Sequence, residues 1–213
     1  MSFGYIGDIS TKIKQQVKNE GILSVTELLE LEKDGFLGGS LELIEEQTDE
    51  NNVTIIDFLN LKENVYDVHM LQFSNIQGDG TAGSDLSIRF YESGVLESAS
   101  VYQYAFEFGG ATGTFGEFNS TSDTSIFSIA GNFQNNIANG YVYFYNLGNS
   151  SKNSFANFHT ETGHPTQSAI MKFGGGVLPQ ASVVDGIRIF IDTGENFTAF
   201  NFSLFGVKQI WVT

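Results

Sequence analysis

Residues 100–108 read SVYQYAFEF, and in this stretch two kinds of side chain alternate one by one. Every second residue from Tyr102 to Phe108 is aromatic, whereas Gln103, Ala105 and Glu107 stand between them. Successive side chains of a β-strand point to opposite faces of its sheet, so period-two alternation is typical of a strand. The stretch therefore predicts a strand with one aromatic face.

The same rhythm recurs along the chain from Leu41 onward. We expect further strands at residues 41–44, 53–58, 66–73, 86–90, 126–129, 140–145, 155–160, 168–173, 183–191 and 200–207. No helical pattern separates these runs, which excludes a parallel sheet with crossover helices and favours antiparallel sheets. With roughly ten strands, a jelly-roll-like β-sandwich over residues 41–213 is the leading expectation.

Two details of this expectation concern single strands. In residues 66–73 we expect Tyr66, Val68 and Met70 to face the core, and also Leu71 and Phe73 if one β-bulge shifts the alternation. We also expect the three glycines at 174–176 to end the strand that begins at residue 168, and the glycine-rich residues 109–114 to form a turn.

Residues 1–40 differ in character from the rest. Residues 10–19 (STKIKQQVKN) and 24–35 (SVTELLELEKDG) each have a helix-start residue and an apolar stripe at helical spacing. Such short helices are marginal alone, so their apolar faces must pack against the same chain or against a partner. We expect a helical attachment segment whose candidate partner-contact residues are Ile13, Val17, Val25, Leu28 and Leu29.

Composition narrows the classes of function. The formal net charge is −15, from 10 basic and 25 acidic residues, so a nucleic-acid-binding role is disfavoured. There is no run of 18 apolar residues and no signal-peptide pattern, so we expect a soluble protein without membrane insertion. The chain has no cysteine, which excludes disulfides and thiol chemistry.

No catalytic motif is evident. The sequence has no nucleophile elbow and no P-loop, and its acidic residues show no spacing that would pair them. We therefore expect a non-enzymatic protein without a cofactor, while a carbohydrate hydrolase with two converging carboxylates remains an alternative. Structural calcium held by Asp79, Asp85 and loop carbonyl oxygens is a further possibility.

Tyrosines at alternate positions suggest a contact surface. Tyr102 and Tyr104 stand in one predicted strand, and residues 141, 143 and 145 in another. Such side chains suit a subunit interface or a sugar-binding platform, but period-two tyrosines also suit a buried sheet face. The candidate interface or glycan-binding aromatics are Tyr102, Tyr104, Tyr143, Tyr145 and Trp211.

Several segments carry a resemblance to a known class of proteins. They are MSFGYIGD at the start, GGSLELI at 38–44, YDVH at 66–69, FSNI at 73–76, RFYESG at 89–94, VDGIRIF at 184–190 and FSLFGV at 202–207. Together they resemble structural proteins of marine and cyanobacterial tailed phages. The resemblance implies a β-sandwich that multimerises, commonly as a trimer, in tail fibres, appendages or capsid decorations, and it supplies no catalytic residues.

The expected function follows from these observations together. We expect a virion structural protein, made in the host cytoplasm, that forms a homo-oligomer and joins other virion proteins through residues 1–40. A tail-associated fibre or appendage subunit with a role in host attachment is favoured over a head decoration protein. A lectin-like module that binds a host-surface glycan is the alternative from a different class.

Overall fold

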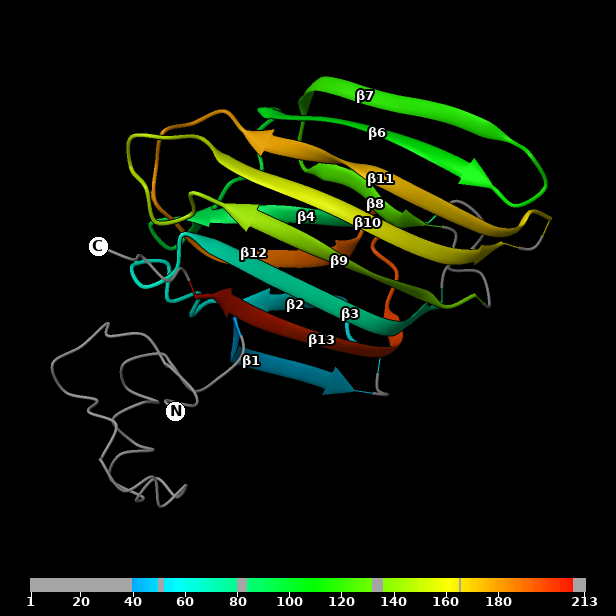
Figure 1. Cartoon of the computed structure of the whole chain (residues 1–213), viewed down its shortest axis with the longest axis horizontal. Coiled ribbons are helices and arrows are strands. Elements are labelled where there is room, and N and C mark those ends of the chain that lie inside the picture. Colours follow the sequence, from blue (N-terminus) through cyan, green and yellow to red (C-terminus); the bar gives the residue numbers. More distant parts are fainter. Residues whose placement is uncertain (1–39, 50–51, 80–83, 132–135, 165, 209–213) are drawn as a thin grey trace, which may run out of the picture. The chain divides into compact units, whose positions relative to one another are not determined.

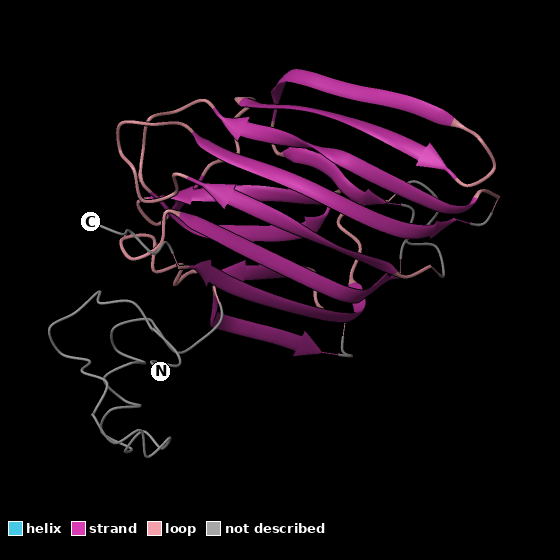
Figure 2. Cartoon of the chain, viewed as in Figure 1, coloured by secondary structure: helices cyan, strands magenta, loops and turns pink. Residues whose placement is uncertain are grey.

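A computed structural model describes residues 40–49, 52–79, 84–131, 136–164 and 166–208. These residues form thirteen strands and no helix (Figures 1 and 2). The strands are β1 (Leu41–Asp49), β2 (Ile55–Phe58), β3 (Val68–Gly78), β4 (Asp85–Glu92), β5 (Val95–Leu96), β6 (Tyr102–Gly110), β7 (Phe115–Asp123), β8 (Ile126–Gly131), β9 (Ala138–Tyr145), β10 (Ser154–His164), β11 (Ser168–Leu178), β12 (Val184–Ile191) and β13 (Phe197–Val207).

The strands belong to two antiparallel sheets. The large sheet has eight strands in the order β1-β13-β3-β9-β10-β11-β6-β7, and it runs from the bottom to the top of Figure 1. The small sheet has the order β2-β12-β4-β5, with β8 also paired to β4. The two sheets pack face to face, so the fold is an antiparallel β-sandwich.

One hydrophobic core fills the space between the sheets. Phe144 of β9 in the large sheet meets Phe90 of β4 in the small sheet edge to face, with ring centroids 5.9 Å apart. On β6, the predicted alternation holds, because Tyr102 and Phe106 are buried whereas Glu107 is exposed. Each fully buried phenylalanine contributes about 1.5–3 kcal/mol of hydrophobic free energy relative to an exposed one.

The two edge strands of the large sheet lie at the margin of this core, which β1 meets through the half-buried Ile44. Neither β1 nor β7 contains a buried residue. On β7, Phe118 is 55% exposed although it stacks on Phe106 and Phe108, with centroids 5.6 and 6.0 Å away. The small sheet therefore leaves this end of the large sheet uncovered on its inner side.

The two ends of the sandwich meet at one corner of the large sheet. Leu41, which begins β1, pairs with Val207, which ends β13. The backbone amide of Lys208 donates to the carbonyl oxygen of Ser40 at 2.8 Å. The chain thus enters and leaves the described sandwich through neighbouring residues.

The all-β, antiparallel prediction is confirmed, but several local predictions are wrong. In β3 the core-facing residues are His69 together with Leu71 and Phe73, which were expected there, whereas Val68 and Met70 point to the opposite face. The pairing of β3 with β9 has no register shift from Val68 to Phe73, where the bulge was expected; its shift lies farther on, between Phe73 and Ile76. Tyr66 is buried, but it precedes the strand.

The predictions for two glycine-rich segments also need correction. Residues 174–176 do not end a strand, because β11 runs through them to Leu178. Residues 109–114 do contain a turn, but it closes a hairpin with β7, a strand that the sequence analysis did not include. The predicted helices at residues 10–19 and 24–35 lie outside the described residues, and the jelly-roll assignment stays a prediction.

Candidate binding face

The outer face of the large sheet is the side turned away from the small sheet, and at its centre it is aromatic. In β9, Val142 and Phe144 are fully buried, so Tyr141, Tyr143 and Tyr145 point outward. The rings form a row, because Tyr143 lies 5.6 Å from Tyr141 and 6.4 Å from Tyr145, centroid to centroid. The alternation of tyrosine with apolar residues in GYVYFY thus places one row in the core and the other on the surface.

Neighbouring strands extend this aromatic row. Tyr145 pairs with Phe155 of β10, and Tyr141 pairs with His159, whose ring centroid is 6.0 Å away. His159 in turn pairs with Phe173 of β11. Phe155 and Phe173 are 43% and 49% exposed, respectively, so no part of the described chain covers the surface that they form.

A groove crosses the outer face beside these rings. Asn157, Gly175, Ala105 and Asn119 stand opposite one another on β10, β11, β6 and β7. Because these side chains are short, they leave a groove over the outer face of the sheet, with a volume of about 580 Å³. Its lining combines aromatic rings with amide and hydroxyl groups, and comprises Gln103, Tyr104, Ala105, Asn119, Ser120, Thr121, Tyr145, Phe155, Ala156, Asn157, Gly175, Gly176 and Val177.

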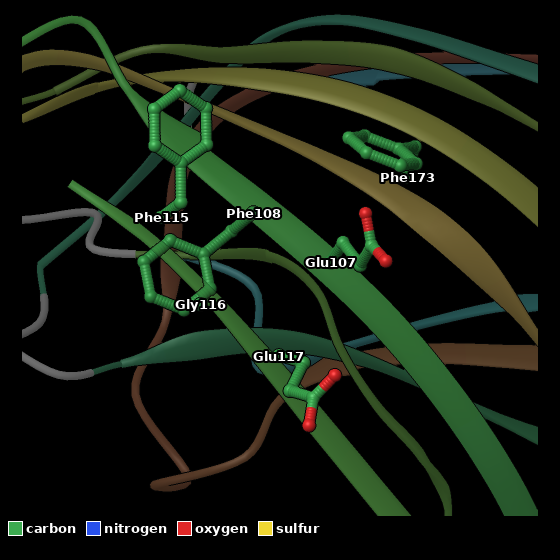
Figure 3. A pocket seen from close by; sticks show the side chains of 6 residues that line it. All are labelled: Glu107, Phe108, Phe115, Gly116, Glu117 and Phe173. Carbon is green, nitrogen blue, oxygen red and sulfur yellow. The ribbon is translucent and has the colours of Figure 1, made fainter. Parts of the chain in front are cut away.

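Two carboxylates stand together next to this groove. Glu107 of β6 is directly opposite Glu117 of β7, and both line a second hollow of about 490 Å³ together with Phe115 and Phe173. Figure 3 shows the two carboxylates projecting from adjacent strands, with the Phe173 ring beside Glu107. Directly opposed like charges destabilise a strand pair, so a hydroxyl-bearing or cationic partner would relieve their repulsion.

The structure separates the predicted contact aromatics into two groups. Tyr143 and Tyr145 lie on the outer face, as a contact role requires. Tyr102 is fully buried, accepting a hydrogen bond from the Phe90 amide at 2.8 Å and donating one to the Glu97 carbonyl at 3.2 Å. The prediction is wrong for Tyr102, because β6 turns its aromatic side toward the core, and burial raises the pKa of its phenol.

Tyr104 follows the same inward direction as Tyr102. Its ring stacks on Phe106 at 6.2 Å, and its hydroxyl donates to Asp123 at 3.1 Å. Burial, supported by that hydrogen bond to a carboxylate, raises the pKa of Tyr104 to about 12. Tyr104 touches the groove only from its inner side, while the remaining predicted contacts, Ile13, Val17, Val25, Leu28, Leu29 and Trp211, lie outside the described residues.

The sequence analysis missed several residues of the outer face. Phe155, Asn157 and His159 alternate with the buried Ala156 and Phe158. This pattern could have placed the three on one face, but nothing in the sequence says that this face is the exposed one. The juxtaposition of Glu107 and Glu117 depends on the register of the missed strand β7, so it could not be anticipated.

The two candidate calcium ligands, Asp79 and Asp85, bind different partners in the structure. Asp79 accepts hydrogen bonds from the backbone and side-chain amides of Asn196 at 2.7 and 2.8 Å, which hold its pKa below the usual value. Asp85 instead forms an ion pair with Lys172. Within the described part of the chain, no three His, Asp or Glu side chains are grouped so that they could hold a metal ion.

Comparisons with known proteins add no identity. No helix within the described ranges is both long and apolar enough to cross a membrane. No family model, no curated protein and no solved structure matches this chain.

Proposed function

We propose that this protein is a non-enzymatic virion structural protein of a tailed phage. It is a fibre or appendage subunit that acts by binding other proteins and the host surface. In this proposal its sandwich is of the jelly-roll kind, and its outer face joins copies of the chain into a homo-oligomer, with a trimer as the expected form. Residues 1–40 attach the subunit to neighbouring virion proteins, and the oligomer helps to attach the particle to its host. The observation that carries the proposal is the exposed aromatic outer face.

The composition of that face supports self-assembly. Tyr145, Phe155, Met171 and Phe173 are between 37% and 49% exposed. Tyr145 pairs with Phe155, and Phe173 pairs with His159, which lies beside the tyrosine row. Tyrosine, phenylalanine and methionine are enriched in protein interfaces, and a monomer rarely leaves a large contiguous apolar patch in water. A stable interface buries roughly 800 Å² on each partner, which the width of this eight-stranded sheet accommodates.

Charge supports the choice of this face over the remaining surface. Copies with a net charge of −15 repel one another, so the contact has to centre on a region without charge. The tyrosine row and Phe155 are such a region, whereas Glu107, opposite Phe173, and Glu161, opposite Met171, stand at its edge. Since salt screens the repulsion, we expect added salt to strengthen the assembly.

Light scattering on the purified protein tests the proposal. The wild-type chain should have the mass of an oligomer, and the double variant Tyr143→Ser/Phe173→Ser should have the mass of a monomer. The control is Val95→Ser, because Val95 is 70% exposed but lies on β5 of the small sheet. A monomeric wild type, or a control that dissociates equally, would contradict self-assembly through the outer face.

A lectin-like role is the second candidate, and the groove favours it. Sugars stack on aromatic rings and hydrogen-bond to amides, and the groove offers Tyr145 and Phe155 beside Gln103, Asn119 and Asn157. A glycan array probed with the intact oligomer should then identify a ligand whose binding falls in Asn157→Ala. Tyr145 and Phe155 belong both to the proposed interface and to the groove, so an intact oligomer binds a sugar there only where its subunit contact leaves these two rings open.

The Glu107–Glu117 pair provides a direct test of the non-enzymatic part of the proposal. Glycoside hydrolysis needs two carboxyl groups on either side of the scissile bond. We expect no release of reducing sugar from bacterial surface polysaccharides by the wild-type protein. A release that disappears in Glu107→Gln or Glu117→Gln would replace this proposal with a hydrolase.

A further inference from the structure

A lysine and an aspartate meet between the two sheets. Lys172 lies on β11 of the large sheet, opposite the inward-facing Thr160, and Asp85 begins β4 of the small sheet. The Lys172 Nζ is 3.2 Å from the Asp85 Oδ1. The two side chains are only 12% and 18% exposed, so this contact is withdrawn from bulk water.

The surroundings hold the two groups together. The Lys172 Nζ also donates to Ser128 Oγ at 2.5 Å and to the Ser128 carbonyl at 3.3 Å, and it lies 5.4 Å from the centre of the Phe106 ring. Gly131 supplies the necessary space, because a Cβ at this position would overlap the Asp85 carboxylate and crowd the Lys172 ammonium group. The site is therefore shaped around this pair.

A second carboxyl group stands beside the pair. Asp192 Oδ1 accepts a hydrogen bond from the backbone amide of Asp85 at 2.8 Å, and the Asp192 amide donates to the Asp85 carbonyl at 3.0 Å. Burial lowers the pKa of Lys172 despite the attraction of Asp85, and burial raises the pKa of Asp192. The first shift favours the uncharged amine, which is the nucleophilic form, and the second favours a protonated Asp192 beside the reacting carboxyl group.

We propose that Lys172 and Asp85 join in an amide bond that links the two sheets covalently. The Lys172 nitrogen, once it has given up a proton, attacks the Asp85 Cγ with its lone pair. The Nζ–Cγ bond forms, and one Cγ–O bond breaks as that oxygen leaves as water with the protons from the ammonium group. Ammonium and carboxylate become amide and water, so atoms and charges balance without any oxidant or reductant.

Two properties of the site favour the formation of this amide bond. Holding two reacting groups in contact raises their effective concentration to about 10⁵–10⁸ M in favourable intramolecular cases. The low-polarity site also disfavours the two separated charges relative to the neutral amide. Since the chain has no cysteine, such a bond would provide a covalent cross-link of the kind that disulfides provide in many extracellular proteins.

Mass spectrometry of the full chain tests the proposal. The folded wild-type protein, purified and incubated at neutral pH, should be lighter than its sequence by one water molecule. A proteolytic digest should contain one branched peptide that joins the Lys172 segment to the Asp85 segment. Recovery of these two segments only as separate peptides overturns the proposal.

Two variants separate the covalent bond from an ordinary ion pair. Lys172→Arg keeps the positive charge near Asp85, but its guanidinium group is a poor nucleophile, so its mass should match its sequence and the branched peptide should disappear. Asp85→Asn can form the same amide with loss of ammonia, so it should yield the same branched peptide as the wild type. An unlinked Asp85→Asn variant that is folded by circular dichroism, beside a linked wild type, would show that the reaction requires the carboxyl group and the loss of water.

Discussion

Arg188 of β12 and Asp57 of β2 stand directly opposite each other and form a bidentate ion pair. The Arg188 Nε is 2.8 Å from the Asp57 Oδ1, and the Nη2 is 2.7 Å from the Asp57 Oδ2. The Tyr91 hydroxyl completes the arrangement, donating to Asp57 at 2.9 Å while accepting from Arg188 at 2.5 Å. Hydrogen bonding to Asp57 raises the pKa of Arg188 above its usual value.

Replacing Arg188 with lysine should destabilise the small sheet at this edge. A lysine keeps the charge but cannot make two parallel hydrogen bonds to one carboxylate, so we expect a loss of about 1–2 kcal/mol in the free energy of unfolding. Urea denaturation measures this loss. The control is Lys62→Ala, because the Lys62–Glu42 pair is 4.0 Å long and exposed, and its removal should leave stability unchanged.

His69 should make the fold sensitive to mild acid. Its ring is fully buried, its Nε2 lies 2.8 Å from the Leu61 carbonyl oxygen, and burial lowers the pKa of the imidazole from the usual 6.5. The unfolded chain therefore takes up a proton near pH 6.5 that the folded chain does not. Stability is present in full above pH 6.5 and should fall below it by about 1.4 kcal/mol per pH unit, until the pH reaches the folded-state pKa.

Unfolding midpoints measured between pH 7.5 and about pH 5 check the His69 prediction, since that window brackets its unfolded-state pKa. The decline contributed by His69 should disappear in His69→Gln, even if that variant is less stable at neutral pH. His159 is exposed on β10, so His159→Asn should retain the decline of the wild type. An unchanged slope in His69→Gln would assign the acid sensitivity to other groups.

Two phenylalanines close together in register should respond very differently to truncation. Phe158 of β10 is 1% exposed and contacts the Phe106 ring at 6.1 Å, so Phe158→Ala should cost about 3–5 kcal/mol of stability. Phe173 of β11 is 49% exposed, so Phe173→Ala should change the stability of the monomer little and weaken self-association instead. Denaturation at concentrations that dissociate the oligomer, combined with light scattering, separates the two effects.

Gly174 should tolerate no side chain. A Cβ at this position would overlap the carbonyl oxygen of Ala105 and the Cα and Cβ of Phe106, all of which belong to β6 and cannot move without breaking the sheet. We expect Gly174→Ala to cost at least about 2 kcal/mol, within the range known for overpacked cores. Gly94→Ala is the comparison, because Gly94 has a φ of +77° and open space around it, and its replacement should cost about 1 kcal/mol through backbone strain alone.

Alternation in the sequence identified most strands, but it could not say which face of a strand is buried. In β6 the aromatic side faces the core, whereas in β9 the tyrosine side faces out because Val142 and Phe144 take the core positions. Both faces of β9 are apolar enough to be buried, so only the other sheet decides between them. For the same reason Val68 and Met70 were assigned to the wrong face of β3.

Strand β7 could not be predicted because its sequence lacks a buried face. Residues 115–123 read FGEFNSTSD, and no residue among them is buried. Their β conformation comes from hydrogen bonding to β6, which is a property of the assembled sheet rather than of the segment. The groove and the Glu107–Glu117 pair both depend on β7, so they were beyond the reach of sequence patterns.

The joining of Ser40 and Lys208 at one corner has a mechanical consequence. When the chain is pulled from both sides of the sandwich, the load falls first on the hydrogen bond between these two residues and then on the rungs that follow it from Leu41 and Val207. Backbone hydrogen bonds that are loaded one after another break at low force. Strand β1 should therefore separate from β13 while the remaining strands stay paired. A sandwich loaded through these two residues would therefore yield first at β1 and recover when the load is released.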